Sequence, residues 1–299
     1  ANQIAQFYLH PFTLPQIERG EEAAAHVARH YERFEDLREQ GLDALIITGA
    51  NVAGADLSAQ NFWEPLIEVV SWAMEQVTST LCSCLATHAV MQFRYGHQRR
   101  PLGFKRWGVF PHRVRLRRHP LVAGVNTRFD VPHSRFNEVP AAAFAASGLP
   151  VLADSDGEVH LATSEDGLRL VFHQGHPEYD AVSLLKEYKR EVGRWYDGER
   201  DDYPPFPDNY LGARARAILT EYAERLRAGR AGLADFPEDL VVPGLDNTWH
   251  DTAEAIMNNW IGKVYQVTSL DRRLPFRPNV DPDDRSEEHT SELQSHAPI

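Results

Sequence analysis

The sequence predicts an α/β protein with a mostly parallel sheet and helices on both of its faces. Residues 43–48 (DALIIT) form a short apolar run, rich in β-branched side chains, that ends at Gly49 as a buried parallel strand does. Residues 63–76 place apolar side chains at helical spacing, and a second short strand is expected over 78–82. This order of strand, helix and strand is typical of parallel strands joined by crossover helices.

The other elements are predicted from the same periodicities. A segment rich in Ala, Glu and Arg, without Pro or Gly, predicts a helix over 21–40. The middle of the chain, 101–167, contains more turns and shorter strands. The remaining predictions are helices at 85–95, 181–196, 213–230 and 252–264, a buried strand at 168–173, and short apolar or alternating runs at 109–116, 141–146 and 151–153.

The chain has 299 residues, of which 42% are apolar, and is therefore long enough to bury a sizeable core. No linker or internal repeat divides it, so we expect a single domain over 1–284. The tail 285–299 (RSEEHTSELQSHAPI) is polar and has no apolar period, and we expect it to be disordered or artefactual. At the other end the sequence runs from Ala1 directly into apolar residues, so we expect the natural protein to begin further upstream.

Charge and cysteine content restrict the class of protein. A formal net charge of −12 argues against general nucleic-acid binding. No apolar run approaches the ~20 residues of a membrane-spanning helix, and no signal peptide precedes the first helix. The two cysteines, Cys82 and Cys84, cannot form a disulfide framework. We therefore expect a reduced, cytoplasmic protein that binds neither nucleic acid nor a membrane.

One basic stretch departs from the acidic balance. Between Arg94 and Arg118 there are nine basic residues and no Asp or Glu. A solvated basic face accounts for most such stretches, and the more specific hypothesis is a binding site for a small polyanion such as a CoA phosphate tail. The nine residues are Arg94, Arg99, Arg100, Lys105, Arg106, Arg113, Arg115, Arg117 and Arg118.

Cys84 lies where the second predicted strand meets a helix, in 79–88 (STLCSCLATH). A sharp turn there would lift the sulfur above the sheet edge, and the first N–H groups of the helix favour a thiolate and can hold an oxyanion. Cys82 lies inside the strand and fits the commoner role of a small buried apolar side chain. A bridge between the two is disfavoured, because residues two apart cannot reach disulfide geometry without strain.

His176 and Glu178 follow the last predicted strand, in 172–180 (FHQGHPEYD). A general base held by a carboxylate is what a cysteine nucleophile requires. Open α/β sheets place their sites beyond the carboxyl ends of the strands, so Cys84 and His176 are expected to meet there. On spacing alone, a surface turn explains the His–carboxylate pair equally well.

These motifs occur together in a known family. Over residues 42–268 the chain resembles the homoserine O-succinyltransferase (homoserine transsuccinylase) family, which implies a flavodoxin-like sheet of the class I glutamine-amidotransferase type, here lacking its first N-terminal strand. The resemblance rests on 45–50 (LIITGA), 77–84 (VTSTLCSC), 105–110 (KRWGVF), 132–135 (PHSR), 175–180 (GHPEYD), 258–260 (NNW) and 264–268 (VYQVT).

The resemblance implies a role for each matching position. Cys84 matches the nucleophile that carries the acyl thioester, His176 the proton acceptor and Glu178 its partner. Lys105, Ser134 and Arg190 match substrate-binding positions. A guanidinium at 190 suits the homoserine carboxylate through a forked pair of hydrogen bonds.

Position 53 corresponds to the site at which the family distinguishes acyl groups. Glu there resembles acetyl-using members and a small residue resembles succinyl-using ones; this chain has Ala53. A buried Glu would fill the pocket and repel a succinyl carboxylate, whereas Ala does neither. Backbone N–H groups near Ala53 and Leu85 are expected to stabilise the oxyanion. The chain departs from the family pattern at Leu85, His88 and Asn51, where Trp, Gln and Pro are expected.

The implied reaction transfers a succinyl group from succinyl-CoA to L-homoserine, the first committed step of methionine biosynthesis, in a homodimer without a cofactor. An acetyl-CoA donor, or a cysteine-triad amidase or amidotransferase of the same fold, is an alternative within the enzymes. A non-catalytic protein on the same scaffold is an alternative of another class. A metal site is disfavoured despite 14 histidines, since no His-x-x-x-His with a third ligand lies near these motifs.

Overall fold

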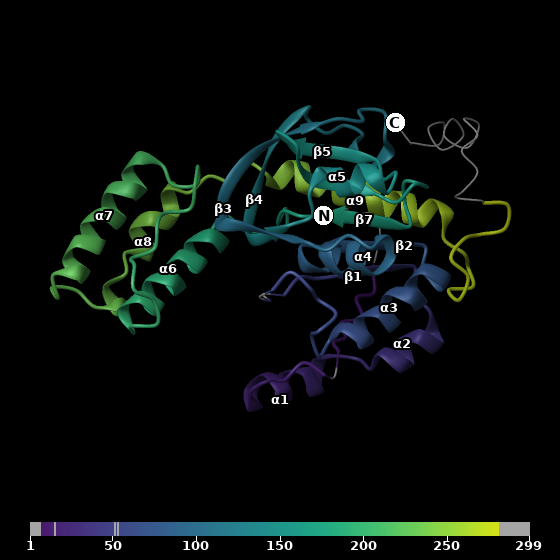
Figure 1. The fold of residues 1–299 in the computed structure, drawn as a ribbon, viewed down its shortest axis with the longest axis horizontal. Helices are drawn as coiled ribbons and strands as arrows, with labels where there is room; N and C mark the ends of the chain where they lie inside the picture. The colour runs from purple at the N-terminus through teal and green to yellow at the C-terminus, as the bar shows by residue number, and fades with distance from the viewer. Residues whose placement is uncertain (1–6, 15, 51, 53, 281–299) are drawn as a thin grey trace.

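The computed structural model describes residues 7–14, 16–50, 52 and 54–280. Its centre is a seven-stranded sheet with the order β1-β2-β7-β6-β5-β3-β4 (Figure 1). The strands are β1 (Ala44–Ile47), β2 (Ser79–Ser83), β3 (Arg100–Val114), β4 (Arg128–Glu138), β5 (Val151–Ser155), β6 (Glu158–Thr163) and β7 (Leu170–His173). The helices are α1 (Glu21–His30), α2 (Phe34–Gln40), α3 (Trp63–Gln76), α4 (Leu85–Tyr95), α5 (Ala141–Ala146), α6 (Ser183–Tyr196), α7 (Ala213–Arg227), α8 (Glu238–Val241) and α9 (His250–Val267), with short 3-10 turns at Pro120–Val122, Leu233–Asp235 and Val242–Gly244.

The sheet has a parallel part and an antiparallel part. β1 pairs with β2, and β2 with β7, in parallel. The other neighbours, β7–β6, β6–β5, β5–β3 and β3–β4, are antiparallel. The predicted α/β class is confirmed, and the predicted parallel arrangement holds for β1, β2 and β7 but not for the rest of the sheet. The difference arises because short turns, rather than crossover helices, join strands of the middle segment.

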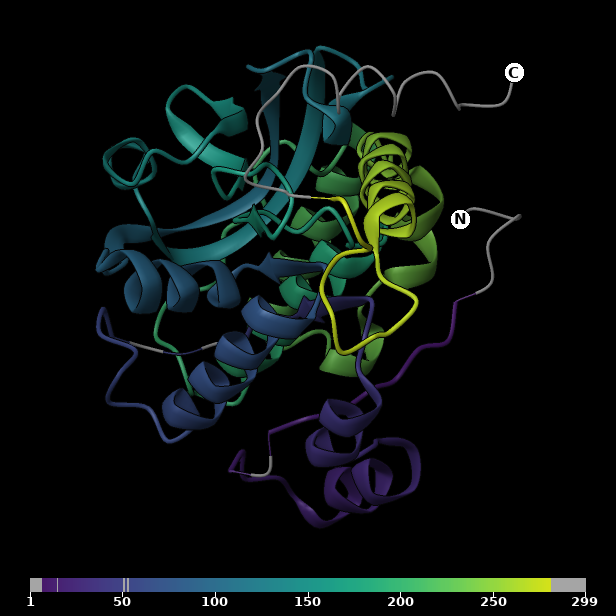
Figure 2. The ribbon, with the colours of Figure 1, turned by 90° about the vertical axis from the view of Figure 1, so that its right-hand side faces the viewer.

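Helices cover both faces of the sheet (Figures 1 and 2). On one face α3, α4 and α5 pack against Cys82 of β2 and Phe172 of β7. On the other face α9 packs against Leu81 and Val171, the neighbours of those two residues along the same strands. Alternate residues of each strand thus enter opposite cores, as a sheet buried on both faces requires.

A helical lobe extends from the sheet at the β3–β4 side (Figure 1). Helices α6, α7 and α8 share an apolar core with Trp107 and Val109 of β3. The backbone of Asp208 pairs with β3 at Gly108, where a Cβ would lie 2.2 Å from the Asp208 carbonyl oxygen. The lobe is therefore fixed to the strand that contributes Lys105.

Three predicted elements differ from the structure. The helix expected over 21–40 is two helices, because Glu32 bridges to Phe12 and Phe34 stacks on Phe12 with ring centroids 5.6 Å apart. The run 141–146 is the helix α5, and the alternating run 109–116 belongs to the much longer β3. α3 and α4 have the predicted bounds. The predicted tail 285–299 lies outside the described residues.

Candidate functional site

The turn between β2 and α4 holds Cys84 in a conformation that is unusual for a residue with a side chain. Its backbone has φ 51° and ψ −108°, and α4 begins at the next residue, Leu85. The Cys84 N–H donates to the carbonyl oxygen of His173 at 2.8 Å, and Thr87 Oγ1 donates to the same oxygen at 3.0 Å. Strain of this kind persists only where surrounding contacts enforce it, and it concentrates at functional sites.

The two cysteines have different environments. Both are free thiols; Cys82 is fully buried and Cys84 is half-buried. Burial raises the pKa of Cys82 to about 12, so that thiol stays protonated and unreactive. Cys84 is therefore the thiol available for chemistry.

The parallel pairing of β2 and β7 brings the second motif to Cys84. Ser83 of β2 lies opposite His173 of β7 in the register, so the segments that follow these two strands leave the sheet at the same edge. His176 forms a hydrogen bond with the Cys84 side chain, and its Nδ1 lies 2.8 Å from Glu178 Oε1. The three residues thus form a chain from thiol to imidazole to carboxylate.

The charge state of His176 follows from these contacts. Burial alone would lower the pKa of His176, but hydrogen bonds to Cys84 and Glu178, together with the negative charge of both, raise it to about 10. Burial would raise the pKa of Glu178, and the His176 hydrogen bond and charge outweigh it and lower that pKa. These contacts therefore favour the protonated form of the imidazole, which Glu178 holds through Nδ1.

A second polar group, the Glu187 cluster, lies beside this chain and consists of Glu187, Lys105, Ser134 and Tyr179. Glu187 Oε2 accepts from Ser134 Oγ at 2.6 Å and from Lys105 Nζ at 3.1 Å, while Oε1 accepts from Tyr179 OH at 2.6 Å. The Tyr179 ring stacks on the His176 imidazole with centroids 4.6 Å apart. The predicted substrate residues Lys105 and Ser134 are thus brought together next to His176.

Glu187 and Tyr179 were not predicted as site residues. Glu187 comes three residues before Arg190, on the helix that follows the His-Pro-Glu turn, and Tyr179 is inside that turn. A carboxylate on the helix face of a predicted substrate-binding arginine was the available signal for Glu187. Its partners come from β3 and β4, distant in sequence, so spacing alone could not identify the cluster.

The remaining predicted site residues are Arg190, Leu85 and Ala53. Arg190 is on α6 with its side chain 63% exposed, and its nearest ion-pair partner is Glu191 at 3.9 Å. Leu85 is the first residue of α4, where the backbone N–H has no partner within the helix. Ala53 lies outside the described residues. Gly49 comes so close to the turn that a Cβ there would be 3.0 Å from Cys84 Cβ.

Gln174 fixes the segment that carries His176. Its Nε2 donates to the carbonyls of Val139 and Val159, and its Oε1 accepts from the Val139 N–H and lies 3.2 Å from His88 Nε2. His88 must therefore carry its proton on Nε2, because the Gln174 oxygen can only accept. This buried contact connects α4, which follows Cys84, to the segment that precedes His176.

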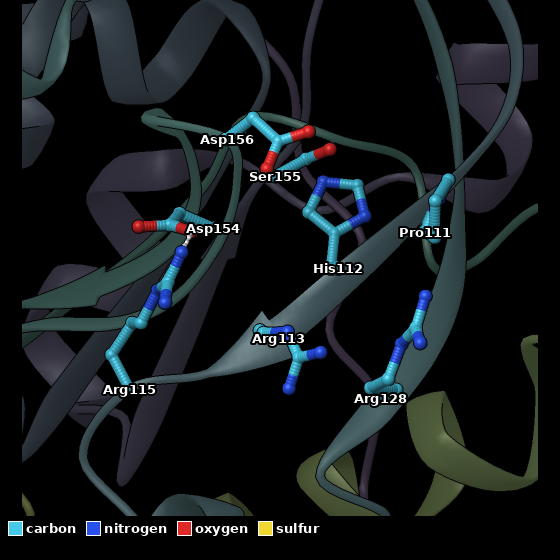
Figure 3. Close-up of a pocket in the computed structure, with 8 residues that line it drawn as sticks. All are labelled: Pro111, His112, Arg113, Arg115, Arg128, Asp154, Ser155 and Asp156. Carbon is cyan, nitrogen blue, oxygen red and sulfur yellow. Dashed lines mark hydrogen bonds and ion pairs between the residues drawn. The ribbon is translucent and has the colours of Figure 1, made fainter.

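The basic stretch 94–118 is dispersed over several partners. Arg100 pairs with Glu138 at 2.7 Å, and Arg106 pairs with Glu158 at 2.7 Å. Arg115 pairs with Asp154 at the rim of a cavity of about 80 Å³ (Figure 3). The cavity is lined by Pro111, His112, Arg113, Arg115, Arg128, Asp154, Ser155 and Asp156. Carboxylates thus offset part of the basic charge that the sequence shows.

Two further properties concern metals and membranes. Within the residues that the structure describes, no group of three or more His, Cys, Asp or Glu side chains is arranged to hold a metal ion. Within the same ranges, no helix is long and apolar enough to cross a membrane.

The chain is similar in sequence to proteins of one family. The family model of homoserine O-succinyltransferase matches residues 1–270. A homoserine O-succinyltransferase of Allochromatium vinosum is 63% identical over 95% of this chain and 81% of its own length, and that of Cardiobacterium hominis is 45% identical over 95% and 80%. Among solved structures, a glutamine amidotransferase of Methylobacillus flagellatus shares 14% identity over 80% of this chain and 86% of its own, with a TM-score of 0.46. The chain is an acyltransferase and belongs to the homoserine O-succinyltransferase family.

Proposed function

We propose that the protein transfers a succinyl group from succinyl-CoA to the hydroxyl of L-homoserine through a thioester on Cys84. The observation that supports it most directly is the strained Cys84 in hydrogen-bond contact with His176, which Glu178 holds in turn. A nucleophile, a base and an orienting carboxylate within hydrogen-bond reach are the parts that covalent acyl transfer requires.

In the first half-reaction the Cys84 thiolate attacks the thioester carbonyl of the acyl donor. The N–H of Leu85, the first residue of α4, is the donor that we assign to the oxyanion. When the bond from the carbonyl carbon to the CoA sulfur breaks, the His176 imidazolium gives its proton to that sulfur. The products are free CoA, a succinyl thioester on Cys84 and a neutral imidazole.

Acylation prepares His176 for the second half-reaction. Two of the influences that raise its pKa to about 10 are the hydrogen bond to Cys84 and the charge of that side chain. Both are lost when the sulfur becomes part of a thioester, so the pKa of His176 falls and the neutral form becomes a base at ordinary pH. His176 then accepts the proton of the homoserine hydroxyl as its oxygen attacks the thioester carbonyl. The bond from that carbonyl carbon to the Cys84 sulfur breaks, which releases O-succinylhomoserine and restores the Cys84 thiolate beside the protonated His176.

The Glu187 cluster supplies groups suited to the amino-acid acceptor. Homoserine carries an ammonium and a carboxylate, and the cluster offers the Glu187 carboxylate and the Lys105 ammonium next to His176. We assign the ammonium to Glu187 and the carboxylate to Lys105 and Arg190, whose charge acts on Lys105. Ser134, hydrogen-bonded to Glu187, completes this site.

The wider assignments are part of the same proposal. The reaction would be the first committed step of methionine biosynthesis, carried out by a cytoplasmic homodimer, with succinyl-CoA as co-substrate and no resident cofactor. These assignments depend on the identity of the acyl donor and of the acceptor.

The test is the intact mass of the protein after mixing with succinyl-CoA without acceptor, followed by peptide mapping. We expect a succinyl adduct on Cys84 that disappears when L-homoserine is added. Cys84→Ala should form no adduct, whereas the matched control Cys82→Ala should, because Cys82 is buried in the core. If acetyl-CoA acylated Cys84 in preference to succinyl-CoA, the proposed donor would be wrong and the proposed thioester chemistry would stand. Absence of any adduct in folded protein, with glutamine hydrolysis instead, would contradict acyl transfer.

A further inference from the structure

We propose that Arg99 binds the free carboxylate of the succinyl group and thereby selects a dicarboxylic acyl donor; this inference rests on the Cys84 acyl-enzyme proposed above.

Arg99 is a buried cation held by backbone oxygens. It is 5% exposed and lies directly before β3. Its Nη2 donates to the Val52 and Gly54 carbonyls at 2.7 and 2.6 Å, and its Nε donates to Gly54 at 2.9 Å. These carbonyls belong to residues on either side of position 53. Carbonyl oxygens satisfy hydrogen bonds but do not neutralise a buried charge, which requires a negative partner.

The segment that Arg99 holds begins at the nucleophile. A Cβ on Gly49 would lie 3.0 Å from Cys84 Cβ, and the chain continues from there to Val52 and Gly54. Burial lowers the pKa of Arg99, and within the described residues the negative charge of Cys84 is what counteracts this effect. Arg99 therefore holds the loop that begins beside the nucleophile, at Gly49.

Acylation removes that compensation. Once Cys84 is a thioester its charge is gone, and Arg99 would be left as a buried cation beside a neutral group. A succinyl group carries a carboxylate two methylenes beyond the thioester carbonyl, and so returns a negative charge to the same region. An acetyl or butyryl group does not. Binding of the dicarboxylic acyl group thus restores the charge balance that its own attachment disturbs.

A second buried arginine shows what Arg99 lacks. Arg135 is 4% exposed and also interacts with the charge of Cys84. It has carboxylate partners in the protein, Glu158 at 3.2 Å and Glu138 at 3.7 Å. Within the part of the chain that the structure describes, Arg99 has no carboxylate within ion-pair distance, and the N–H groups of its Nη1 make no hydrogen bond. These donors suit a carboxylate of the substrate.

The experiment compares succinyl-CoA with butyryl-CoA, which has the same chain length without the carboxylate. In the wild type we expect faster acylation of Cys84 by succinyl-CoA, measured as kcat/KM or as the rate of adduct formation by mass. In Arg99→Met we expect the ratio of the two rates to fall about 10- to 100-fold, as loss of a charge-assisted hydrogen bond predicts. Because the ratio cancels any damage to the loop, a purely structural role of Arg99 would lower both rates and leave the ratio unchanged.

The matched control is Arg100→Met, the same change one residue along the chain, at a side chain that is 64% exposed and paired with Glu138. Arg100→Met should leave the ratio of the two acylation rates unchanged. Arg99→Lys, which keeps a positive charge, should retain part of the preference for succinyl-CoA. Should Arg99→Met not fold, the wild-type ratio and Arg99→Lys decide. A wild type that accepts butyryl-CoA as well as succinyl-CoA, or an unchanged ratio in the variants, would overturn the assignment of Arg99. Failure of both donors to acylate Cys84 would instead refute the proposed function.

Discussion

Two carboxylates belong to the site, Glu178 in contact with His176 and Glu187 one residue further away behind Tyr179, and they are held in opposite ways. Glu178 has a side chain that is 56% exposed and binds one partner, the imidazole, from two residues away along the chain. Glu187 has a side chain that is 11% exposed and receives hydrogen bonds from three side chains on three different segments. Glu178 belongs to a local motif and raises the pKa of His176. Glu187 belongs to a cluster of residues distant in sequence that joins the helical lobe to the sheet. The same functional group therefore contributes mainly to chemistry at one position and to structure and binding at the other.

The largest effect is expected for Glu187→Ala. The change leaves the Lys105 ammonium and the hydroxyls of Ser134 and Tyr179 without their partner in a largely buried site. We expect the free energy of unfolding to fall by about 3–5 kcal/mol, as for removal of one member of a buried ion pair. Urea unfolding of the variant and the wild type measures it. Glu187→Gln keeps the shape of the side chain, so its free energy of unfolding should fall by less. A fall below about 1 kcal/mol for Glu187→Ala would show that the cluster does not stabilise the fold.

Glu178→Gln should have the reverse profile. Without the carboxylate the imidazole loses its orientation and part of the support for its charged form, so kcat should fall about 100-fold. Stability should change by less than about 1 kcal/mol, because Glu178 is mostly exposed and surface ion pairs contribute little. Steady-state kinetics and urea unfolding of the same preparation test both. An equal loss of stability in Glu178→Gln and Glu187→Ala would remove the distinction between the two carboxylates.

Arg190→Ala should show a smaller effect on the rim of the Glu187 cluster. The guanidinium is exposed, and its one ion pair within the described residues is with Glu191 at 3.9 Å, so the free energy of unfolding should be unchanged. If Arg190 holds the homoserine carboxylate, KM for homoserine should rise about 10-fold with little change in the acylation of Cys84 by the donor. Arg194→Ala, one turn further along α6 and also exposed, is the matched control. A slower acylation step in Arg190→Ala would instead place this residue at the donor.

The contrast between the carboxylates also explains what could be predicted from sequence. Cys84, His176 and Glu178 were predicted because each follows a predicted strand closely and because the segments that contain them resemble a known family. Parallel pairing of β2 and β7 brings those two segments together. Glu187 and Arg99 acquire their roles from partners distant in sequence, on β4 and in the loop after β1. The local periodicity of apolar residues does not show contacts between residues that are distant in sequence.

The elements of the fold also differ in how far local sequence determines them. The buried helices α3 and α4 were predicted with their exact bounds, because apolar spacing and a terminal Gly96 define them. The break near Glu32 depends on a backbone bridge to Phe12, which composition cannot show. The antiparallel half of the sheet escaped prediction because its strands are joined across turns and β-bulges that blur the alternation of side chains.

The smallest expected effects are on the pH dependence of stability, which should differ between His176 and Glu187. The folded pKa of His176, about 10, is above its ordinary value of 6.5, so this residue contributes stability that is fully present below about pH 6.5 and is lost as pH rises through 10. Burial opposes ionisation of Glu187, but its hydrogen bonds and Lys105 lower the pKa below the ordinary 4.5, so its contribution is present above pH 4.5 and is lost as pH falls. The difference in unfolding free energy between the wild type and His176→Asn should therefore shrink toward alkaline pH, and that for Glu187→Gln toward acid pH. Parallel pH profiles for the two variants would mean that His176 and Glu187 titrate as one coupled unit, and that the orienting carboxylate and the buried cluster are not separate devices.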